Sequence, residues 1–414
     1  MTQAQDWRKK ILEKADKARD QPAKLGPDIT IPEFEIKSSE RNSISNPREL
    51  PKDVQQASNT VGINPDEKFR SGTYFQYDHS VVLARALKTV PGVEVMSTSE
   101  ALEKYSWMKD YWWNAVQVDM DKYTATAELK QTHGYFIRTE PNTRLTLPVQ
   151  ACLFIGTQGT IQCPHNVIIA EKNSELHIIT GCATHPNIDQ GMHIGISEFY
   201  VKEGATITFT MIHGWAPNFE VRPRTGAIIE RNGTFLNNYI CFRPVKTLQM
   251  YPVAYCIGEN SRARYHTLIY GSGDSYIDAG SRAFLRAKGA RAEVTARVIA
   301  KDRVQIISRG HLVGEVAETK AHLDCRGLML SSEARIHAIP ELEGKVEGTD
   351  LSHEAAVGKI QEEQLNYLMA RGLNADQATA LIVRGFLDPE VPGLPDQLRT
   401  EVKRIVQLTA EKAL

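Results

Sequence analysis

The chain has 414 residues, of which 49 are lysine or arginine and 50 are aspartate or glutamate. This length is enough to bury a large hydrophobic core, and as a prior it suggests two or three domains. Because the charge is balanced and no block of like charge stands out, we expect no nucleic-acid binding driven by counterion release. No apolar run approaches the roughly 20 residues of a membrane-spanning helix, so we expect no membrane association.

The N-terminal sequence and the cysteines indicate a cytoplasmic protein. MTQAQDWRKK has no apolar segment after its charges, so it does not read as a secretory signal, and the cysteines are expected to be reduced. None of them forms C-x-x-C, so neither a self-contained zinc finger nor a ferredoxin-type cluster is expected. For four of the six we expect the role of a small buried hydrophobe. The six are Cys152, Cys163, Cys182, Cys241, Cys256 and Cys325.

Residues 1–123 are predicted to form an N-terminal region of helices and loops. Residues 4–20 read as a helix with Trp7, Ile11, Leu12 and Ala15 on one face. The polar stretch 21–70 is expected to be loop, and 81–87 a short helix or buried segment. Ser97 and the residues after it carry helix-capping chemistry, and the aromatic ALEKYSWMKDYWWNAV that follows is expected to pack as a helix face.

Residues 124–350 are predicted to form a β-rich core. Segments such as ELHIITG and AEVTARVIA are short, β-branched and alternating. Gly159, Gly181, Gly204 and Gly226 are spaced by 22, 23 and 22 residues. A period near 20, with about three short strands per repeat, favours a parallel β-helix with one coil per period. An antiparallel sandwich or jelly roll is the alternative, since it gives similar strands without a fixed period.

Residues 351–414 are predicted to form a C-terminal helical domain. One apolar stripe ends at Gly372, Asn374 caps a second helix, and 396–412 form a third amphipathic helix. From the pattern alone, these helices either cap the solenoid or offer a docking surface for a partner.

Two stretches, LMLSSEARIHAIPELE and DLSHEAAVGKIQEEQLNYLMARGL, closely resemble the SufB/SufD family of iron–sulfur cluster assembly scaffolds, in a short form similar to archaeal SufB. The resemblance implies a mainly β fold, a right-handed parallel β-helix core with N-terminal and C-terminal α-helical regions. It also implies a homodimer whose C-terminal helices bind SufC, an ATPase of the ABC type. A sulfur donor and apo-protein acceptors would be further partners, and a transient iron–sulfur cluster the cofactor.

Cys325 is the first candidate ligand, because SufB-type scaffolds hold the nascent cluster on a cysteine at the matching position. A thiolate is also the ligand that iron in a cluster takes and the group that can carry a persulfide. His353 and Glu354 match a His-Glu pair of SufB, with the glutamate implicated in cluster binding. Adjacent side chains on an extended strand point to opposite faces, so a straight strand offers only one of the two unless a turn or a second copy relaxes that limit.

Cys182, in IITGCATHP, resembles the SufB cysteine that receives sulfur from a donor. The sulfur would then pass through the β-helix interior to Cys325. The residues that line this path in bacterial SufB match poorly here, as at Met211, so sulfide entering directly is the alternative.

Two other functions remain open on the sequence. One is a structural, SufD-like subunit that docks the ATPase and holds no cluster. The other is a polysaccharide-acting β-helix enzyme, for which we find no acidic cluster between Thr124 and Ile339. No P-loop, G-x-G-x-x-G or Ser-His-Asp order is present, so we expect an assembly scaffold rather than an enzyme, with ATP bound by a partner.

Overall fold

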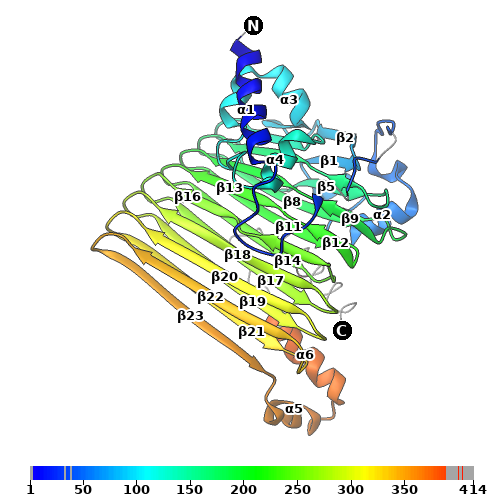
Figure 1. The fold of residues 1–414 in the computed structure, drawn as a ribbon, viewed down its shortest axis with the longest axis vertical. Helices are drawn as coiled ribbons and strands as arrows, with labels where there is room; N and C mark the ends of the chain where they lie inside the picture. The colour runs from blue at the N-terminus through cyan, green and yellow to red at the C-terminus, as the bar shows by residue number, and fades with distance from the viewer. Residues whose placement is uncertain (1–2, 32–33, 38–39, 388–399, 401–402, 404–414) are drawn as a thin grey trace.

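The computed structural model describes residues 3–31, 34–37, 40–387, 400 and 403. The fold is mainly β, with 44% of residues in strands and 19% in helices, and its centre is a β-solenoid of about 8 turns (Figure 1). This confirms the predicted fold class. In the described part of the chain, no helix is both long enough and apolar enough to cross a membrane.

Two sheets form opposite walls of the solenoid. In the described chain the first, here called the ten-strand sheet, pairs its strands in the following order: β2 (Ser80–Ala86), β1 (Gly72–Tyr77), β5 (Val149–Ile155), β8 (Glu175–Thr184), β11 (Thr206–Gly214), β14 (Thr234–Cys241), β17 (Arg262–Gly271), β19 (Arg291–Ala300), β21 (Thr319–Met329) and β23 (Thr349–Lys359). Only its first pair, β1 with β2, is antiparallel.

The second, thirteen-strand sheet is split along part of its length. Its strands are β3 (Val93–Ser97), β4 (Tyr135–Thr139), β6 (Ile161–Gln162), β7 (His165–Ala170), β9 (Gln190–His193), β10 (Ile196–Val201), β12 (Asn218–Val221), β13 (Arg224–Ile229), β15 (Thr247–Met250), β16 (Val253–Cys256), β18 (Tyr276–Leu285), β20 (Gln305–Gly314) and β22 (Arg335–Gly344). The long β18 pairs with both β15 and β16. The predicted three strands per coil therefore hold before β18, and later coils have two. The parallel pairing through the coils excludes the antiparallel sandwich.

The true repeat is longer than the glycine spacing predicted. Arg262, Arg291, Lys320 and Asp350 are in register on successive strands, which gives repeats of 29, 29 and 30 residues. Gly181 lies inside β8 against Val61, whereas Gly204 lies in a turn, so the glycines of the predicted period are not equivalent. The predicted period near 20 is wrong.

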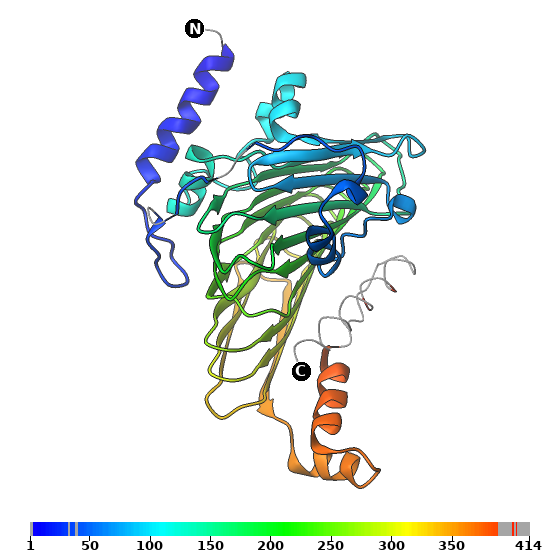
Figure 2. The same ribbon diagram turned by 90° about the vertical axis from the view of Figure 1, so that its right-hand side faces the viewer.

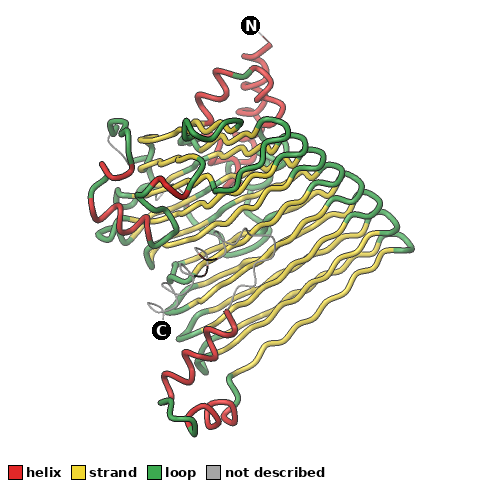
Figure 3. Tube along the Cα trace, turned by 180° about the vertical axis from the view of Figure 1, so that it is seen from behind, coloured by secondary structure: helices red, strands yellow, loops and turns green. Residues whose placement is uncertain are grey.

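One turn of each coil, leading into the ten-strand sheet, holds a residue with positive φ. These residues are Asn142, Asn173, Gly204, Asn232, Asn260, Gly289, Glu318 and Gly348. Each of the first seven donates its backbone N–H to a carbonyl in the matching turn of the next coil. Asparagine and glycine tolerate this left-handed conformation best, and they occupy seven of the eight positions. The turns stack along one edge of the solenoid (Figure 3).

The N-terminal region covers the first coils. Its helices are α1 (Gln3–Ala18), α2 (Lys52–Asn59), α3 (Thr98–Lys104) and α4 (Lys122–Leu129), with 3-10 turns η2 (Pro47–Glu49), η3 (Glu67–Phe69) and η4 (Ser106–Tyr111). The predicted first helix and the Ser97 cap are confirmed, because the Ser97 hydroxyl accepts the Glu100 N–H.

Three local predictions for this region need correction. The stretch 21–70 contains α2 besides loop, and the aromatic helix ends at Lys104 before a 3-10 turn. The segment 81–87 lies mostly in the strand β2 rather than in a helix, although Val82 and Leu83 are buried, as the alternative predicted. Strands also begin at Gly72 rather than near Thr124, where α4 lies. Tertiary pairing decides here, because β1 and β2 extend the ten-strand sheet next to β5.

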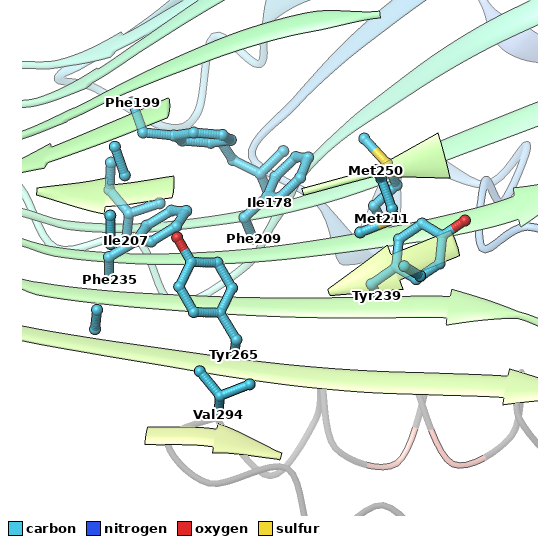
Figure 4. Close-up of a cluster of buried hydrophobic side chains, with 14 of the residues drawn as sticks. Ile178, Phe199, Ile207, Phe209, Met211, Phe235, Tyr239, Met250, Tyr265 and Val294 are labelled. Atoms are coloured by element: carbon cyan, nitrogen blue, oxygen red, sulfur yellow. The ribbon is translucent and has the colours of Figure 1, made fainter. Parts of the chain in front are cut away.

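The interior of the solenoid is filled from both sheets. Phe199, Phe209 and Phe235 stack across it, with ring centroids of neighbouring pairs 4.7 and 4.9 Å apart (Figure 4). Burial of such side chains is the main stabilising term of the core.

At the other end, β23 leads into α5 (Glu362–Met369) and α6 (Ala375–Leu387), which lie beside the narrow end of the solenoid (Figure 2). Val383 and Leu387 of α6 are buried against the outside of the ten-strand sheet. The predicted caps are confirmed: Gly372 has φ +96°, and the Asn374 side chain accepts the Gln377 N–H. The predicted third helix, 396–412, lies outside the described residues.

Candidate functional site

Cys325 lies on β21, one strand from the end of the solenoid, and points inward. Ala321, Leu323 and Cys325 alternate with more exposed residues, and the Cys325 side chain is 2% exposed. The Ser308 hydroxyl donates to its sulfur at 3.9 Å. Burial raises the pKa of the Cys325 thiol, and the nearby Asp324 carboxylate adds to this, whereas the bond from Ser308 and the charge of Arg297 oppose it. Sequence analysis did not find Ser308, which comes from the opposite sheet.

The last strand, β23, carries the other two candidates on opposite faces. Its register pairs Leu323 with His353, Asp324 with Glu354, and Cys325 with Ala355. Because β23 is continuous from Thr349 to Lys359, His353 shares the inward face with Cys325, offset by two residues, and Glu354 points outward. Both are exposed, and among the described strands β23 pairs with β21 alone.

The outward face is a ladder of charges. Asp324 contacts Arg297 at 2.7 Å and Arg326 at 3.2 Å, and Arg326 lies 3.9 Å from Glu354. Across the described residues, no group of three or more His, Cys, Asp or Glu side chains is placed to hold a metal ion. One copy of the chain therefore brings His353 to the face of Cys325 but does not gather Cys325, His353 and Glu354 at one point.

Cys182 is fully buried in the solenoid, far from Cys325. It lies on β8 in register with His213 on β11, which pairs in turn with Cys241 on β14. From β8 to β21 there are five strand steps, or about 24 Å at about 4.8 Å per step. Burial raises the pKa of the Cys182 thiol well above its usual value.

Cys325 belongs to a column of inward-facing side chains that are in register across the ten-strand sheet, from β21 toward β11. Ala296 and Thr267 precede it on neighbouring strands, followed by Tyr239 and Met211. Through Met211 the column reaches Thr180 on β8, so Cys182 lies two residues further along that strand, and a sulfur path from Cys182 to Cys325 stays a prediction. The small Ala296 and Thr267 leave the least side-chain bulk next to Cys325.

A groove of about 1030 Å³ opens beside the strands that carry Cys182, His213 and Cys241. Its walls are α2 and the loops that follow β8, β11 and β14, including His185, Trp215 and Arg243. Sequence analysis did not find His213, because only the register between coils shows that it lies between Cys182 and Cys241.

Comparison with known proteins places the chain in a family. A family model described as "SUF system FeS cluster assembly, SufBD core domain" matches residues 153–386. An iron–sulfur cluster assembly SufBD family protein of Methanothermobacter thermautotrophicus is 48% identical over 403 residues, covering 96% of this chain and 98% of the relative. A protein of the same description from Archaeoglobus fulgidus is 47% identical over 354 residues, covering 86% and 94%, and one from Pyrococcus horikoshii is 34% identical over 364 residues, covering 87% and 81%. The chain belongs to the SufBD family of iron–sulfur cluster assembly proteins.

Proposed function

We propose that the chain is a scaffold subunit on which an iron–sulfur cluster is built at the open end of the solenoid and then handed to acceptor proteins. The cluster is cargo, and iron and sulfide are its substrates. The observation that carries the proposal is the position of Cys325: it faces inward one strand from the end, and the inward positions His353 and Ala355 beside it are uncovered. A thiolate and an imidazole are both ligands that iron accepts.

A homodimer formed through this end would complete the site. In the described chain β23 pairs only with β21, and β22 only with β20, so each presents an unpaired edge. Val346 and Val357 near this end are 41% and 42% exposed. Unpaired strand edges favour association, and a twofold contact would bring two copies of Cys325 toward each other.

Helices α5 and α6 supply the surface on which we place the ABC-type ATPase. No residue of α5 is buried, and Tyr367 and Met369 on it are 58% and 43% exposed. Leu381 on α6 is 50% exposed. Exposed apolar side chains gathered on two neighbouring helices support a docking surface, and ATP hydrolysis would belong to the partner.

One alternative has an observation in its favour. Cys325 is buried and its pKa is raised, as expected of an inert cysteine in a structural, SufD-like subunit that docks the ATPase without holding a cluster.

Anaerobic reconstitution with ferrous iron, sulfide and the ATPase subunit separates the two functions. We expect Cys325→Ser to abolish the visible absorption of the cluster while circular dichroism shows the fold intact. Cys256→Ala is the matched control, because it removes another buried thiol of the same interior, in a coil nearer the N-terminus. A cluster that forms equally well on Cys325→Ser would reject the proposal and favour the structural subunit.

A further inference from the structure

One hydroxyl group faces Cys325 across the interior of the solenoid. Ser308 lies on β20 in the thirteen-strand sheet, is 4% exposed, and donates its hydroxyl to Cys325 Sγ at 3.9 Å. Because Cys325 lies on β21 in the opposite sheet, this contact joins the two walls. Strand β20 pairs with β18 on one side and β22 on the other, so the hydroxyl is carried on a strand that is held at both edges.

The side chains around this contact are small and apolar. Ala279 and Ala338 are in register with Ser308 on the neighbouring strands of its sheet. Ala296 and Ala355 flank Cys325 in the same way. No alanine side chain can donate a hydrogen bond, and among the described residues no other side chain donates to the Cys325 sulfur.

Packing does not explain a serine at this position. In the described chain Cys325 Sγ is the only hydrogen-bond partner of the Ser308 hydroxyl, and a sulfur atom is a weak acceptor. A hydroxyl that is buried without a strong hydrogen bond costs free energy, whereas alanine fills the neighbouring positions of the same column. A polar side chain where alanine would be at least as stable indicates a role in function.

We infer that Ser308 is a positioning residue for Cys325: its hydroxyl holds the sulfur on the inward face and donates to it when it binds iron. The inference rests on the proposed function, because it requires Cys325 to be a ligand. A sulfur that binds iron brings negative charge into an apolar interior. A hydrogen bond to a charged acceptor is roughly twice as strong as one to a neutral acceptor, so the contact strengthens when the ligand forms.

Threonine and valine at position 308 separate the hydroxyl from the volume of the side chain. Their shapes are nearly the same, and only threonine can donate to the sulfur. We expect Ser308→Thr to behave as the native chain does and Ser308→Val to lose the hydrogen bond. Ser58→Ala is the matched control, because it removes a hydroxyl that lies 3.8 Å from another buried thiol, Cys152, which packs on the outer face of the ten-strand sheet.

Cobalt(II) added to the chain without iron gives a readout that needs no cluster assembly. A hydrogen bond to a metal-bound thiolate stabilises the sulfur electrons, so its loss should move the sulfur-to-cobalt charge-transfer absorption to longer wavelength. We expect this shift in Ser308→Val, with the affinity for cobalt lowered about tenfold, and no shift in Ser308→Thr or Ser58→Ala.

The reduction potential of the reconstituted cluster is the second readout. Hydrogen bonds to ligand sulfur favour the more negative, reduced state of a cluster. After anaerobic reconstitution with the ATPase subunit, we therefore expect a lower reduction potential in Ser308→Val than in Ser308→Thr. Urea unfolding should show the valine variant to be at least as stable as the threonine variant.

Three outcomes would overturn the inference. The first is that spectra, cobalt affinities and reduction potentials are equal in Ser308→Thr and Ser308→Val. The second is that Ser58→Ala changes them as much as Ser308→Val does. The third is a marked loss of stability in Ser308→Val relative to Ser308→Thr, which would assign the hydroxyl to the fold.

Failure of the proposed function would give a different result. In that case Cys325→Ser binds cobalt and assembles clusters as the native chain does, whichever residue stands at position 308. If the inference alone fails, Cys325→Ser loses the cobalt absorption and the cluster, while the two variants of Ser308 agree with each other.

Discussion

A single buried carboxylate, Glu198, fastens the N-terminal region to the solenoid. The side chain is fully buried on β10 and accepts the backbone N–H groups of residues 113–116 at 2.6 to 3.1 Å. His165 Nε2 lies 2.8 Å from the same carboxylate. Glu198→Gln keeps the size but replaces one acceptor oxygen with an NH₂ group, so at least one backbone N–H must face another donor. An orphaned donor costs about 1–3 kcal/mol, and the bonds that remain lose about 1 kcal/mol each with the charge, so we expect a loss of about 4–6 kcal/mol.

The loss should appear first where the segment docks. Hydrogen exchange of the amides of 113–116 should rise steeply in Glu198→Gln, and limited proteolysis should cut the region 98–130 before the coils. Glu203→Gln is the control: this carboxylate lies in a surface turn and binds Lys172 and Arg231 near solvent, so we expect little change. If amide exchange and unfolding are the same in Glu198→Gln and Glu203→Gln, Glu198 does not hold the N-terminal region against the solenoid.

Two further predictions concern stability: its dependence on pH and the effect of replacing glycine in two turns. Burial lowers the pKa of His193 to about 3, so between pH 6.5 and 3 the unfolded chain binds a proton that the folded chain refuses, and stability falls as pH falls. His193→Gln should flatten that slope by about 1.4 kcal/mol per pH unit in urea unfolding from pH 7 to 4, and an unchanged slope would contradict this. Gly258→Ala would place its Cβ 1.9 Å from the Arg231 nitrogen, whereas Gly273, at φ +65°, has no atom within 4 Å. We expect Gly258→Ala to lower the free energy of unfolding by about 3 kcal/mol or more, and Gly273→Ala to lower it by about 1 kcal/mol. Equal urea midpoints for the two variants would contradict the turn geometry described here.

The sequence predicted the class of the fold because alternating β-branched segments dominate it, but it hid the repeat. The feature that the coils share is a backbone conformation, a residue with positive φ in one turn. That residue is asparagine or glycine in seven coils and Glu318 in the eighth. A search for one residue type therefore finds accidental spacings. Strands β1 and β3 were missed for a related reason: β1 pairs with β5 and β3 with β4, far along the chain, and such pairing leaves little local signal.

For the candidate site, alternation predicted correctly that a straight strand separates His353 from Glu354. It could not show that His213 lies between Cys182 and Cys241, because the three are 31 and 28 residues apart and meet only through coils of unequal length. The partners Ser308 and Arg297 belong to other coils for the same reason. Register between coils is a property of the assembled solenoid, and the printed sequence does not carry it.

The face on which each candidate lies limits how two copies can share a cluster. If β23 pairs with β23 of a second copy about a twofold axis, the sheet continues and inward faces stay inward. Cys325 and His353 of both copies would then face one interior, whereas Glu354 would stay outside beside Asp324 and Arg326. Glu354 can join them only if the two end coils meet without continuing the sheet. Loss of the cluster in His353→Gln but not in Glu354→Gln would therefore indicate a continuous sheet, and the reverse pattern would indicate a contact between outward faces.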